Sequence, residues 1–463
     1  MWRLALILAV LSAATSHNTN LIQKYSYNLD FGNFLQVQKQ LNSLKNKNAL
    51  TDYKTEVRRF TSQLVDHFDP LNTKTWNQTY FVHTPAGQTS DVPMVFVGGE
   101  GPTGDQYSFF SALDVPDFRP VGFTLAHRYY QDGEGVNPTS KFDPQTDSKL
   151  LSSKQAIADM ALFIEKVVME EHGFQKPPII FGCSYPGSLT IWMREKYPHL
   201  STGGIALSGP IRAFDNFHQY LEIGEKAVKD NFPKCFPRLV SAKKTLLLAA
   251  KNHGTDFAKQ LNLCTDKGFT KWEQVFNVGW VRLSMTFASG LGQGGSTYEP
   301  ARICSDLQSS TPFKMFREVL GVPDPGTGHC RDPEQLVEEE TQTPQDLESA
   351  YPDWFWQKCT EFGWFKTHSN DSLFTFFTLD AFHQTCNKDF HVSTDVIEAS
   401  IAATNIYYGG TNVQNLKNLL VMNGGDDPWQ IPSVPALPGN DYSGVVVSHK
   451  KRSSMPRKLF KLG

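Results

Sequence analysis

The sequence predicts an α/β fold: a mostly parallel β-sheet with helices on both faces, interrupted by a large helical insertion. Short apolar runs alternate with helical periods between about residues 92 and 207. From about 213 to 405 helical stretches continue without a clear alternation of strands, and strand-like runs return at 419–422 and 445–447. Alternation of strands and helices is typical of a parallel sheet, because each crossover helix returns the chain to the same end of the sheet.

The first core strands are predicted at residues 93–97 and 122–126, two short apolar runs. The first run leads directly into the glycine-rich loop 98–102, as expected where a buried strand ends. Residues 153–173 carry apolar side chains at helical spacing, with serine available as the N-cap and glycine at the end. This pattern predicts an amphipathic helix.

A strand, a turn and a helix follow in close succession. Residues 178–181 predict a buried strand, 187–197 a helix and 204–207 another strand. Ser184 lies in the tight turn between the first of these strands and the helix.

The domain organisation follows from these elements. We expect residues 60–212 and 406–449 to form the two parts of the core, and residues 213–405 to form a helical cap insertion between them. The basic residues 450–463 are expected to form a tail without regular structure. A chain of 463 residues exceeds the usual size of a single domain, in agreement with a core plus an insertion.

Residues 1–16 have the features of a secretory signal peptide: a charged start, an apolar run from Leu4 to Leu11, and small residues before the expected cleavage site. The run is too short for a membrane-spanning helix, which needs about 20 apolar residues. The alternative is a buried N-terminal helix. A signal peptide directs the chain to the secretory route, so we expect a secreted or lysosomal protein.

Six of the seven cysteines fall between residues 235 and 386, and Cys183 stands apart. The secretory route is oxidising, and the spacings match no zinc site. We therefore expect three disulfides within the insertion and a free thiol at Cys183, with the pairing left open among fifteen arrangements. The triplets that begin at Asn77 and Asn370 are acceptors for N-glycosylation and fit the same compartment.

The charge balance limits the classes of partner. The formal net charge is −3 and the charges are spread along the chain, so nothing indicates a nucleic acid or a membrane as a partner. The sequence has no pattern that calls for a metal or a cofactor, and none is expected. The oligomeric state stays open, with a homodimer as one candidate.

The turn at Ser184 has the context of a nucleophile elbow, in which a serine lies between a buried strand and a helix. Residues 181–187 read Phe-Gly-Cys-Ser-Tyr-Pro-Gly, so Pro186 stands where the G-x-S-x-G pattern has its second glycine. The following helix can direct the amide of Tyr185 at a developing oxyanion. The alternative is a serine that only caps the helix.

Two further segments supply candidate partners of Ser184. The loop with Gly98, Gly99 and Glu100 follows a strand, where an α/β-hydrolase takes its second oxyanion amide. Asp427 follows a late strand, where this fold keeps the acid that orients the catalytic histidine. The alternative for this acid is an Asp-Pro turn. The fold class predicted is therefore an α/β-hydrolase sheet with a large helical, disulfide-containing cap insertion.

Together these segments resemble the S28 family of serine peptidases. The resemblance rests on residues 63–68, 98–102, 127–130, 151–156, 182–187 and 427–429, and covers about residues 60 to 430. It implies that Ser184 is the nucleophile and Asp427 the acid of a triad. It also implies that the insertion is the family's helical cap, which covers the active site and selects peptide substrates with proline next to the cut.

The chain departs from the family in two places. Cys183 replaces the usual glycine of the elbow, where its side chain either crowds the turn or packs as a small apolar residue. The Ala-His-Cys context in which the family carries its catalytic histidine is missing. His449 is the best candidate by position, although the two lysines that follow it would disfavour an imidazolium. His127 and His383 are weaker candidates, because the first belongs to a motif at an unrelated position and the second lies in the cap.

The predicted function is a serine-type exopeptidase that cleaves proline-containing peptides through an acyl-enzyme. The family includes carboxypeptidases, which need a cation for the substrate carboxylate, and dipeptidyl aminopeptidases, which need an anion for the substrate ammonium. The sequence leaves this choice open, with Glu100 as a hypothetical ammonium partner. One alternative is a secreted pseudoenzyme of the same fold without a functional catalytic histidine. Another is an esterase or lipase, which would share the triad.

Overall fold

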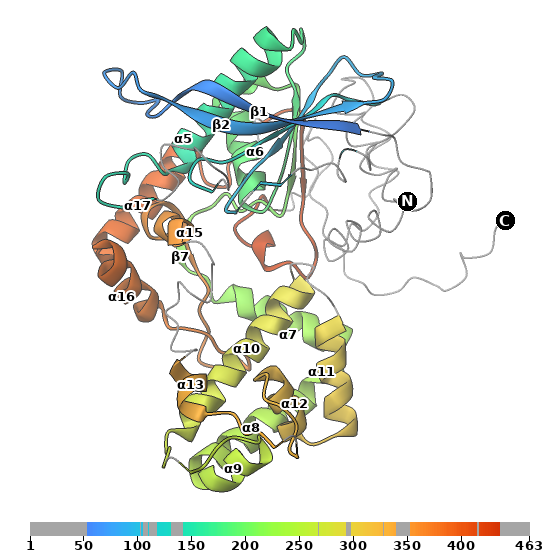
Figure 1. Ribbon diagram of the computed structural model, residues 1–463, viewed down its shortest axis with the longest axis vertical. Helices are drawn as coiled ribbons and strands as arrows, with labels where there is room; N and C mark the ends of the chain where they lie inside the picture. Colours follow the sequence, from blue (N-terminus) through green and yellow to red (C-terminus); the bar gives the residue numbers. More distant parts are fainter. Residues whose placement is uncertain are drawn as a thin grey trace, which may run out of the picture.

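A computed structural model describes residues 53–101, 103–104, 110, 118–130, 142–266, 268–292, 298–326, 328–338, 352–413 and 416–435. A seven-stranded sheet and its helices form one end of the molecule, and a helical lobe forms the other (Figure 1). The expected signal peptide 1–16, the strand 445–447, His449 and the tail 450–463 lie outside the described residues. No helix among the described residues is long and apolar enough to cross a membrane.

The sheet has the strand order β1-β2-β4-β3-β5-β6-β9. Only β2 runs against its neighbours, and all pairs from β4 to β9 are parallel. This is the α/β-hydrolase sheet that the sequence predicts. The strands are β1 (Tyr53–Leu64), β2 (Thr75–Pro85), β3 (Met94–Val97), β4 (Gly122–Leu125), β5 (Ile179–Cys183), β6 (Gly203–Leu207) and β9 (Leu419–Met422).

The hairpin of β1 and β2 is absent from the sequence prediction. In β2 the side chains of Trp76, Gln78, Tyr80 and Val82 are buried in alternation, a period of two that does indicate a strand. In β1 the exposed face is charged and a register shift follows Phe60, so its alternation is weak.

Side chains of the core strands alternate between two buried faces, which explains why these runs are apolar throughout. Val95 packs on the face covered by α5 (Ser153–Phe163) and α6 (Tyr185–Lys196), and Met94 packs on the opposite face. Phe110 contributes to the cover of that second face. Helices α5 and α6 contact each other, so they cover the same side of the sheet.

The amphipathic helix predicted from residue 153 to 173 is confirmed. α5 continues as the π-helix η1 (Ile164–Glu171), and the Ser152 hydroxyl accepts the Gln155 amide hydrogen at 3.3 Å to cap its start. Gly173 ends the helix with φ +74°, a conformation that glycine adopts without strain. α6 begins at Tyr185, two residues earlier than predicted.

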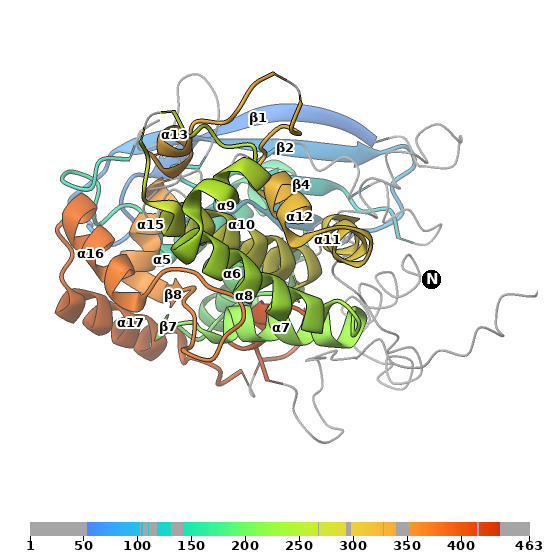
Figure 2. The ribbon, with the colours of Figure 1, turned by 90° about the horizontal axis from the view of Figure 1, so that it is seen from below.

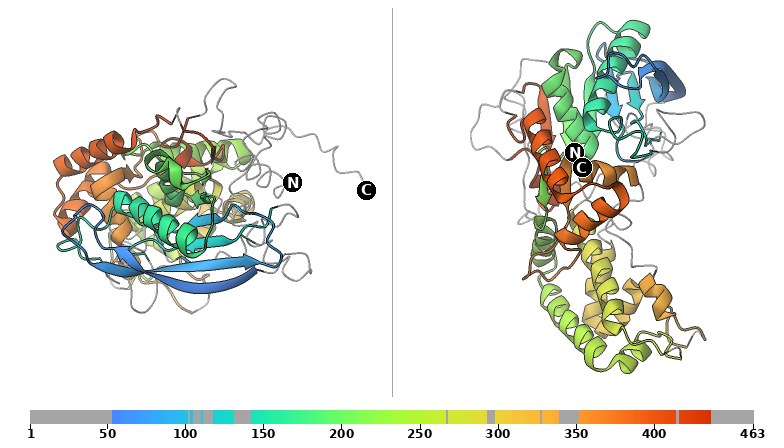
Figure 3. Two further views of the ribbon diagram at one scale, coloured as in Figure 1. Left: turned by 90° about the horizontal axis from the view of Figure 1, so that it is seen from above. Right: turned by 90° about the vertical axis from the view of Figure 1, so that its left-hand side faces the viewer.

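The insertion has two parts, visible from below in Figure 2 and from the side in Figure 3. Its first part is the helical lobe, made of α7 (Gln219–Asn231), α8 (Phe236–Asn252), α9 (Gly254–Gln260), α10 (Trp272–Gly292), α11 (Tyr298–Ser309), α12 (Pro312–Val319) and α13 (Pro333–Glu338). Its second part returns to the core and comprises α15 (Pro352–Gln357), the π-helix η3 (Lys358–Phe362), β8 (Gly363–Phe365), α16 (Leu379–Phe390) and α17 (Thr394–Tyr408). Short 3-10 turns are η2 (Pro198–Leu200) and η4 (Pro428–Gln430).

The two ends of the insertion lie side by side. The Asn405 side chain accepts the Ala213 amide hydrogen at 2.9 Å and donates to the Ala213 carbonyl at 2.7 Å. Next to this contact, β7 (Phe214–Asn216) pairs in parallel with β8. The chain therefore leaves and rejoins the core at one place, as an insertion between two core strands requires.

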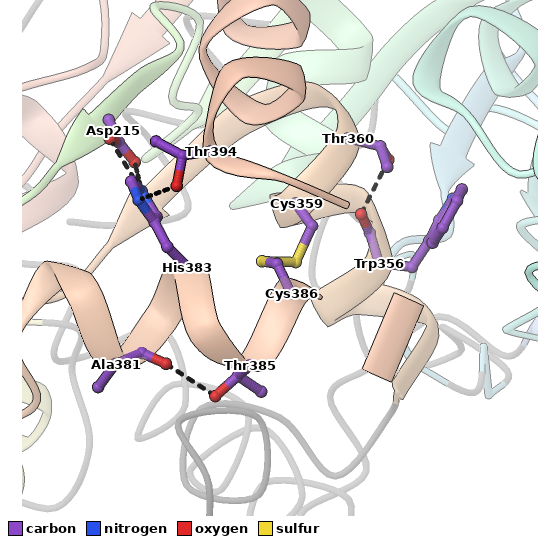
Figure 4. Close-up of a disulfide and its surroundings, with 9 residues drawn as sticks. All are labelled: Asp215, Trp356, Cys359, Thr360, Ala381, His383, Thr385, Cys386 and Thr394. Carbon is purple, nitrogen blue, oxygen red and sulfur yellow. Dashed lines mark hydrogen bonds and ion pairs between the residues drawn. A yellow bond between two sulfur atoms is a disulfide. The ribbon is translucent and has the colours of Figure 1, made fainter. Parts of the chain in front are cut away.

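Three disulfides are confirmed in the insertion: Cys235–Cys304, Cys264–Cys330 and Cys359–Cys386. The first two lie within the helical lobe, and the third joins η3 to α16 (Figure 4). Cys183 is free, as expected. It is half-buried at the end of β5 and packs with apolar neighbours, so it does not crowd the turn.

Candidate active site

Ser184 stands on a strained turn between β5 and α6. Its φ of 62° and ψ of −132° lie in a region that residues with a side chain rarely adopt. The Ser184 amide donates to the Leu207 carbonyl at 2.8 Å, which ties the turn to the end of β6. The strand–turn–helix geometry is that of a nucleophile elbow.

Glycines make this turn feasible. A Cβ atom on Gly182 would lie 2.0 Å from the Pro186 carbonyl oxygen, and one on Gly187 would lie 2.9 Å from the Leu207 carbonyl oxygen. Pro186 falls in the first turn of α6, where no amide hydrogen is needed. Its ring fits because Gly99 faces it: a Cβ on Gly99 would lie 2.4 Å from Pro186 Cγ. The proline that departs from the G-x-S-x-G pattern is thus accommodated by the loop after β3.

The candidate oxyanion donors come from α6 and from the loop after β3. Tyr185 is the first residue of α6, so its amide has no acceptor within the helix. The Gly98 amide, also expected as a donor, is used by the Leu125 carbonyl at 2.8 Å because the ladder between β3 and β4 continues past the strand. Of the two glycines predicted as donors, Gly98 and Gly99, only Gly99 therefore remains as the candidate second donor.

Glu100 lies beside the candidate nucleophile. The Ser184 hydroxyl donates to Glu100 Oε1 at 3.5 Å, a long and weak hydrogen bond. Burial raises the pKa of the Glu100 carboxyl, and the hydrogen bond from Ser184 and the charge of Lys366 act in the opposite direction. An acidic group therefore faces the space next to Ser184.

Asp427 follows β9 at the same edge of the sheet. It is 1% exposed, and its Oδ1 accepts the Trp429 amide hydrogen at 3.0 Å. Its Oδ2 accepts the Ser208 hydroxyl, and the Ser208 amide donates to the Met422 carbonyl at 2.8 Å. Burial raises the pKa of Asp427 to about 7, although both hydrogen bonds lower it. Since β5, β6 and β9 are neighbours, Ser184, Ser208 and Asp427 follow three adjacent parallel strands.

The candidate histidines differ in what they contact. Within the described ranges no histidine hydrogen-bonds to Ser184 or Asp427, and His449 lies outside those ranges. His127 bonds to the hydroxyl of Tyr185 at 3.1 Å, and burial lowers its pKa to about 4. His383 bonds to Asp215 at 3.0 Å in the insertion (Figure 4).

The comparison with known proteins identifies the family of this chain. The family described as serine carboxypeptidase S28 matches residues 63–450. The chain belongs to serine peptidase family S28. A Caenorhabditis elegans protein with a serine protease name is 29% identical in an alignment of 411 positions that covers 81% of this chain and 74% of that protein. Human thymus-specific serine protease is 25% identical in an alignment of 416 positions that covers 83% of this chain and 79% of that protein. Human lysosomal Pro-X carboxypeptidase is 26% identical in an alignment of 395 positions that covers 80% of this chain and 77% of that protein.

Sequence reasoning missed three polar residues at or near the candidate site. Ser208 follows β6, and the rule that parallel strands end at one edge could have found it. Gln357 and Glu361 come from the insertion. Gln357 donates to the Tyr185 hydroxyl in the elbow, and Glu361 accepts from Ser153 at the start of α5. No local pattern marks them.

The remaining site predictions concern the surface and metals. Asn77 and Asn370 are both exposed, as a glycosylated asparagine must be. Over the residues that the structure describes, no group of three or more histidine, cysteine or acidic side chains is arranged to hold a metal ion.

Proposed function

We propose that this S28 member is a serine peptidase that works through an acyl-enzyme, with Ser184 as the nucleophile. The observation that carries the proposal is the strained elbow at Ser184 after β5 together with the buried Asp427 after β9, at the same edge of the parallel sheet. The amides of Tyr185 and Gly99 stabilise the oxyanion as Ser184 Oγ bonds to the substrate carbonyl carbon.

His449 is proposed as the base. It accepts the Ser184 proton during attack and gives it to the leaving amine when the carbon–nitrogen bond breaks, and Asp427 holds the imidazole in the required tautomer. Water, deprotonated by the same histidine, then cleaves the ester and restores the serine.

The substrates we propose are peptides with proline next to the cut, cleaved near one end. Similarity to lysosomal Pro-X carboxypeptidase supports the proline preference. Glu100, beside Ser184, supports the capture of a substrate ammonium, as a dipeptidyl aminopeptidase requires. Lys366, whose positive charge acts on the Glu100 carboxyl next to Ser184, supports the capture of a carboxylate. Peptides blocked at the N-terminus or at the C-terminus separate the two: the block that abolishes cleavage identifies the end that is bound.

A lysosomal or secreted location is proposed from three features. These are the lysosomal name of a relative, the three disulfides, and the two exposed glycosylation acceptors. Removal of N-glycans by an endoglycosidase should lower the mass of the protein, and Asn77→Gln with Asn370→Gln should abolish the difference.

The experiment that tests the reaction is labelling with a fluorophosphonate, which reacts with an activated serine. Labelling of wild type that is lost in Ser184→Ala and in His449→Ala supports the proposed triad. Labelling that survives in His449→Ala means that another group is the base. Folded wild type that is not labelled overturns the peptidase proposal and favours a pseudoenzyme.

A further inference from the structure

The side chain of Tyr185 is enclosed by two separate parts of the chain. Tyr185 is 1% exposed, and its hydroxyl bonds to His127 Nε2 at 3.1 Å and to Gln357 Nε2 at 3.1 Å. Its ring centre lies 5.2 Å from that of Trp354 and 5.6 Å from that of Phe362. His127 belongs to the core, whereas Gln357, Trp354 and Phe362 belong to the insertion. The residue after the candidate nucleophile is therefore held largely from the insertion.

The Arg128 carbonyl and the Gln357 amide determine which group donates in each of these hydrogen bonds. His127 Nδ1 lies 2.7 Å from the Arg128 carbonyl oxygen, which can only accept, so Nδ1 carries the hydrogen. In neutral His127 the other nitrogen then accepts the hydroxyl hydrogen of Tyr185. The Tyr185 oxygen is left as an acceptor, and it receives its second bond from the amide group of Gln357.

Gln357 has one orientation that satisfies its neighbours. Its Nε2 donates to Tyr185 and also to Glu361 Oε1 at 2.8 Å, while its Oε1 accepts the Tyr130 hydroxyl at 2.6 Å. A flipped amide would set acceptor against acceptor both at Tyr185, whose hydrogen is donated to His127, and at the Glu361 carboxylate. Gln357 is 0% exposed, so water does not compete for these bonds.

The turn that carries Gln357 and Glu361 is anchored twice. Glu361 accepts the Ser153 amide hydrogen at 2.9 Å, at the start of α5 in the core. Cys359, which lies between the two residues on η3, is bonded to Cys386 of α16 (Figure 4). A π-helical turn such as η3 is uncommon and occurs frequently at functional sites.

We propose that Gln357 is a positioning residue of the active site, which fixes Tyr185 and thereby the Tyr185 amide that binds the oxyanion. Because Tyr185 begins α6 next to a strained residue, freedom of its side chain would allow the amide to turn away. The insertion then serves catalysis directly, and not only substrate selection. This inference rests on the proposed serine peptidase function.

The test compares Gln357→Leu, Tyr185→Phe and the double variant on a cleaved proline peptide. Tyr185→Phe keeps the ring and removes only the hydroxyl, so it tests the same bond if Gln357→Leu does not fold. Loss of a whole oxyanion donor costs about 10²- to 10³-fold in kcat, so a misplaced donor should cost about 10- to 100-fold, with KM changed less than about twofold. The double variant should be no slower than the slower single variant, since each single variant already removes the bond between Gln357 and Tyr185.

Thr360→Val is the matched control. Thr360 lies on the same π-helix, and its hydroxyl bonds only to the Trp356 carbonyl at 2.8 Å among the described residues. It should keep wild-type kcat. The inference about Gln357 would be overturned if a folded Gln357→Leu or Tyr185→Phe variant kept wild-type kcat. It would also be overturned if the losses in kcat of the two single variants multiplied in the double variant. Neither result would contradict the proposed function. Wild type that neither cleaves nor labels would overturn the proposed function, and the inference with it.

Discussion

The hydroxyl of Ser208, after β6, donates a hydrogen bond to the carboxylate of Asp427, after β9. Together with the Trp429 amide at 3.0 Å, it holds both oxygens of a carboxylate that is almost fully buried. Burial alone would favour the neutral acid, and each of these bonds favours the charged form that a catalytic histidine needs.

Ser208→Ala should therefore raise the pKa of Asp427 further. The acid limb of the pH profile of kcat/KM should move to higher pH, since the carboxylate must be ionised to orient and stabilise the imidazolium. Ser433→Ala is the control, because Ser433 is 1% exposed and its hydroxyl has no hydrogen-bond partner among the described residues. Superimposable profiles for wild type and Ser208→Ala would contradict the prediction.

Gly99→Ala should displace the loop after β3 from the elbow. The new Cβ would come within 2.4 Å of Pro186 Cγ, an overlap that costs about 1–3 kcal/mol if it is relieved by local shifts. We expect kcat to fall by about tenfold or more, because the Gly99 amide is a candidate oxyanion donor. Pro186→Ala removes the overlapping ring atoms, so the double variant should recover part of the lost kcat. A double variant slower than both single variants would argue against this contact as the cause.

Stability should fall as pH rises from about 5 to about 8. Burial raises the pKa of Glu361 from 4.5 to about 7, so the folded protein binds more protons than the unfolded chain between these values. The contribution of Glu361 to the free energy of unfolding is complete below the pKa that Glu361 has in the unfolded chain. It is lost as pH rises through the pKa that Glu361 has in the folded protein. At about 1.4 kcal/mol per pKa unit it is on the order of 3 kcal/mol. Asp427 acts in the same direction.

Urea unfolding of wild type and Glu361→Gln at both pH values measures this contribution. The variant should show a smaller pH dependence, because glutamine does not ionise and can still accept from Ser153. If the unfolding free energy of both proteins depended equally on pH, the pKa of Glu361 would not be raised in the folded state, and the prediction would be wrong.

Arg128→Met should destabilise the protein strongly. Arg128 is 0% exposed and donates two bonds of 2.6 Å to Asp159, which also bonds to His67 at 2.8 Å. Removal of one member of a buried pair costs about 3–5 kcal/mol, because the other charge stays buried. Adding Asp159→Asn should restore part of the loss. Arg58→Met, which breaks an exposed pair with Glu56, is the control and should change the melting temperature little.

The sequence determined the features that depend on neighbours along the chain. The apolar runs of β3, β5 and β6, the helix α5 with its serine cap and glycine end, and the turn at Ser184 all follow from spacing within a few residues. The confinement of six cysteines to one stretch likewise predicted three disulfides there. The weakly alternating β1 was missed because its register shift and charged face blur a period of two.

The tertiary structure decided what depends on residues far apart in the chain. The partners of the cysteines, the bond from Ser208 to Asp427, and the fit of Pro186 against Gly99 depend on strand order and close approach. The contact between Tyr185 and Gln357 joins residues 172 positions apart. Such pairs leave no periodic signal, because a buried hydrogen bond between them is selected by geometry in the folded state and not by the local preference of either segment.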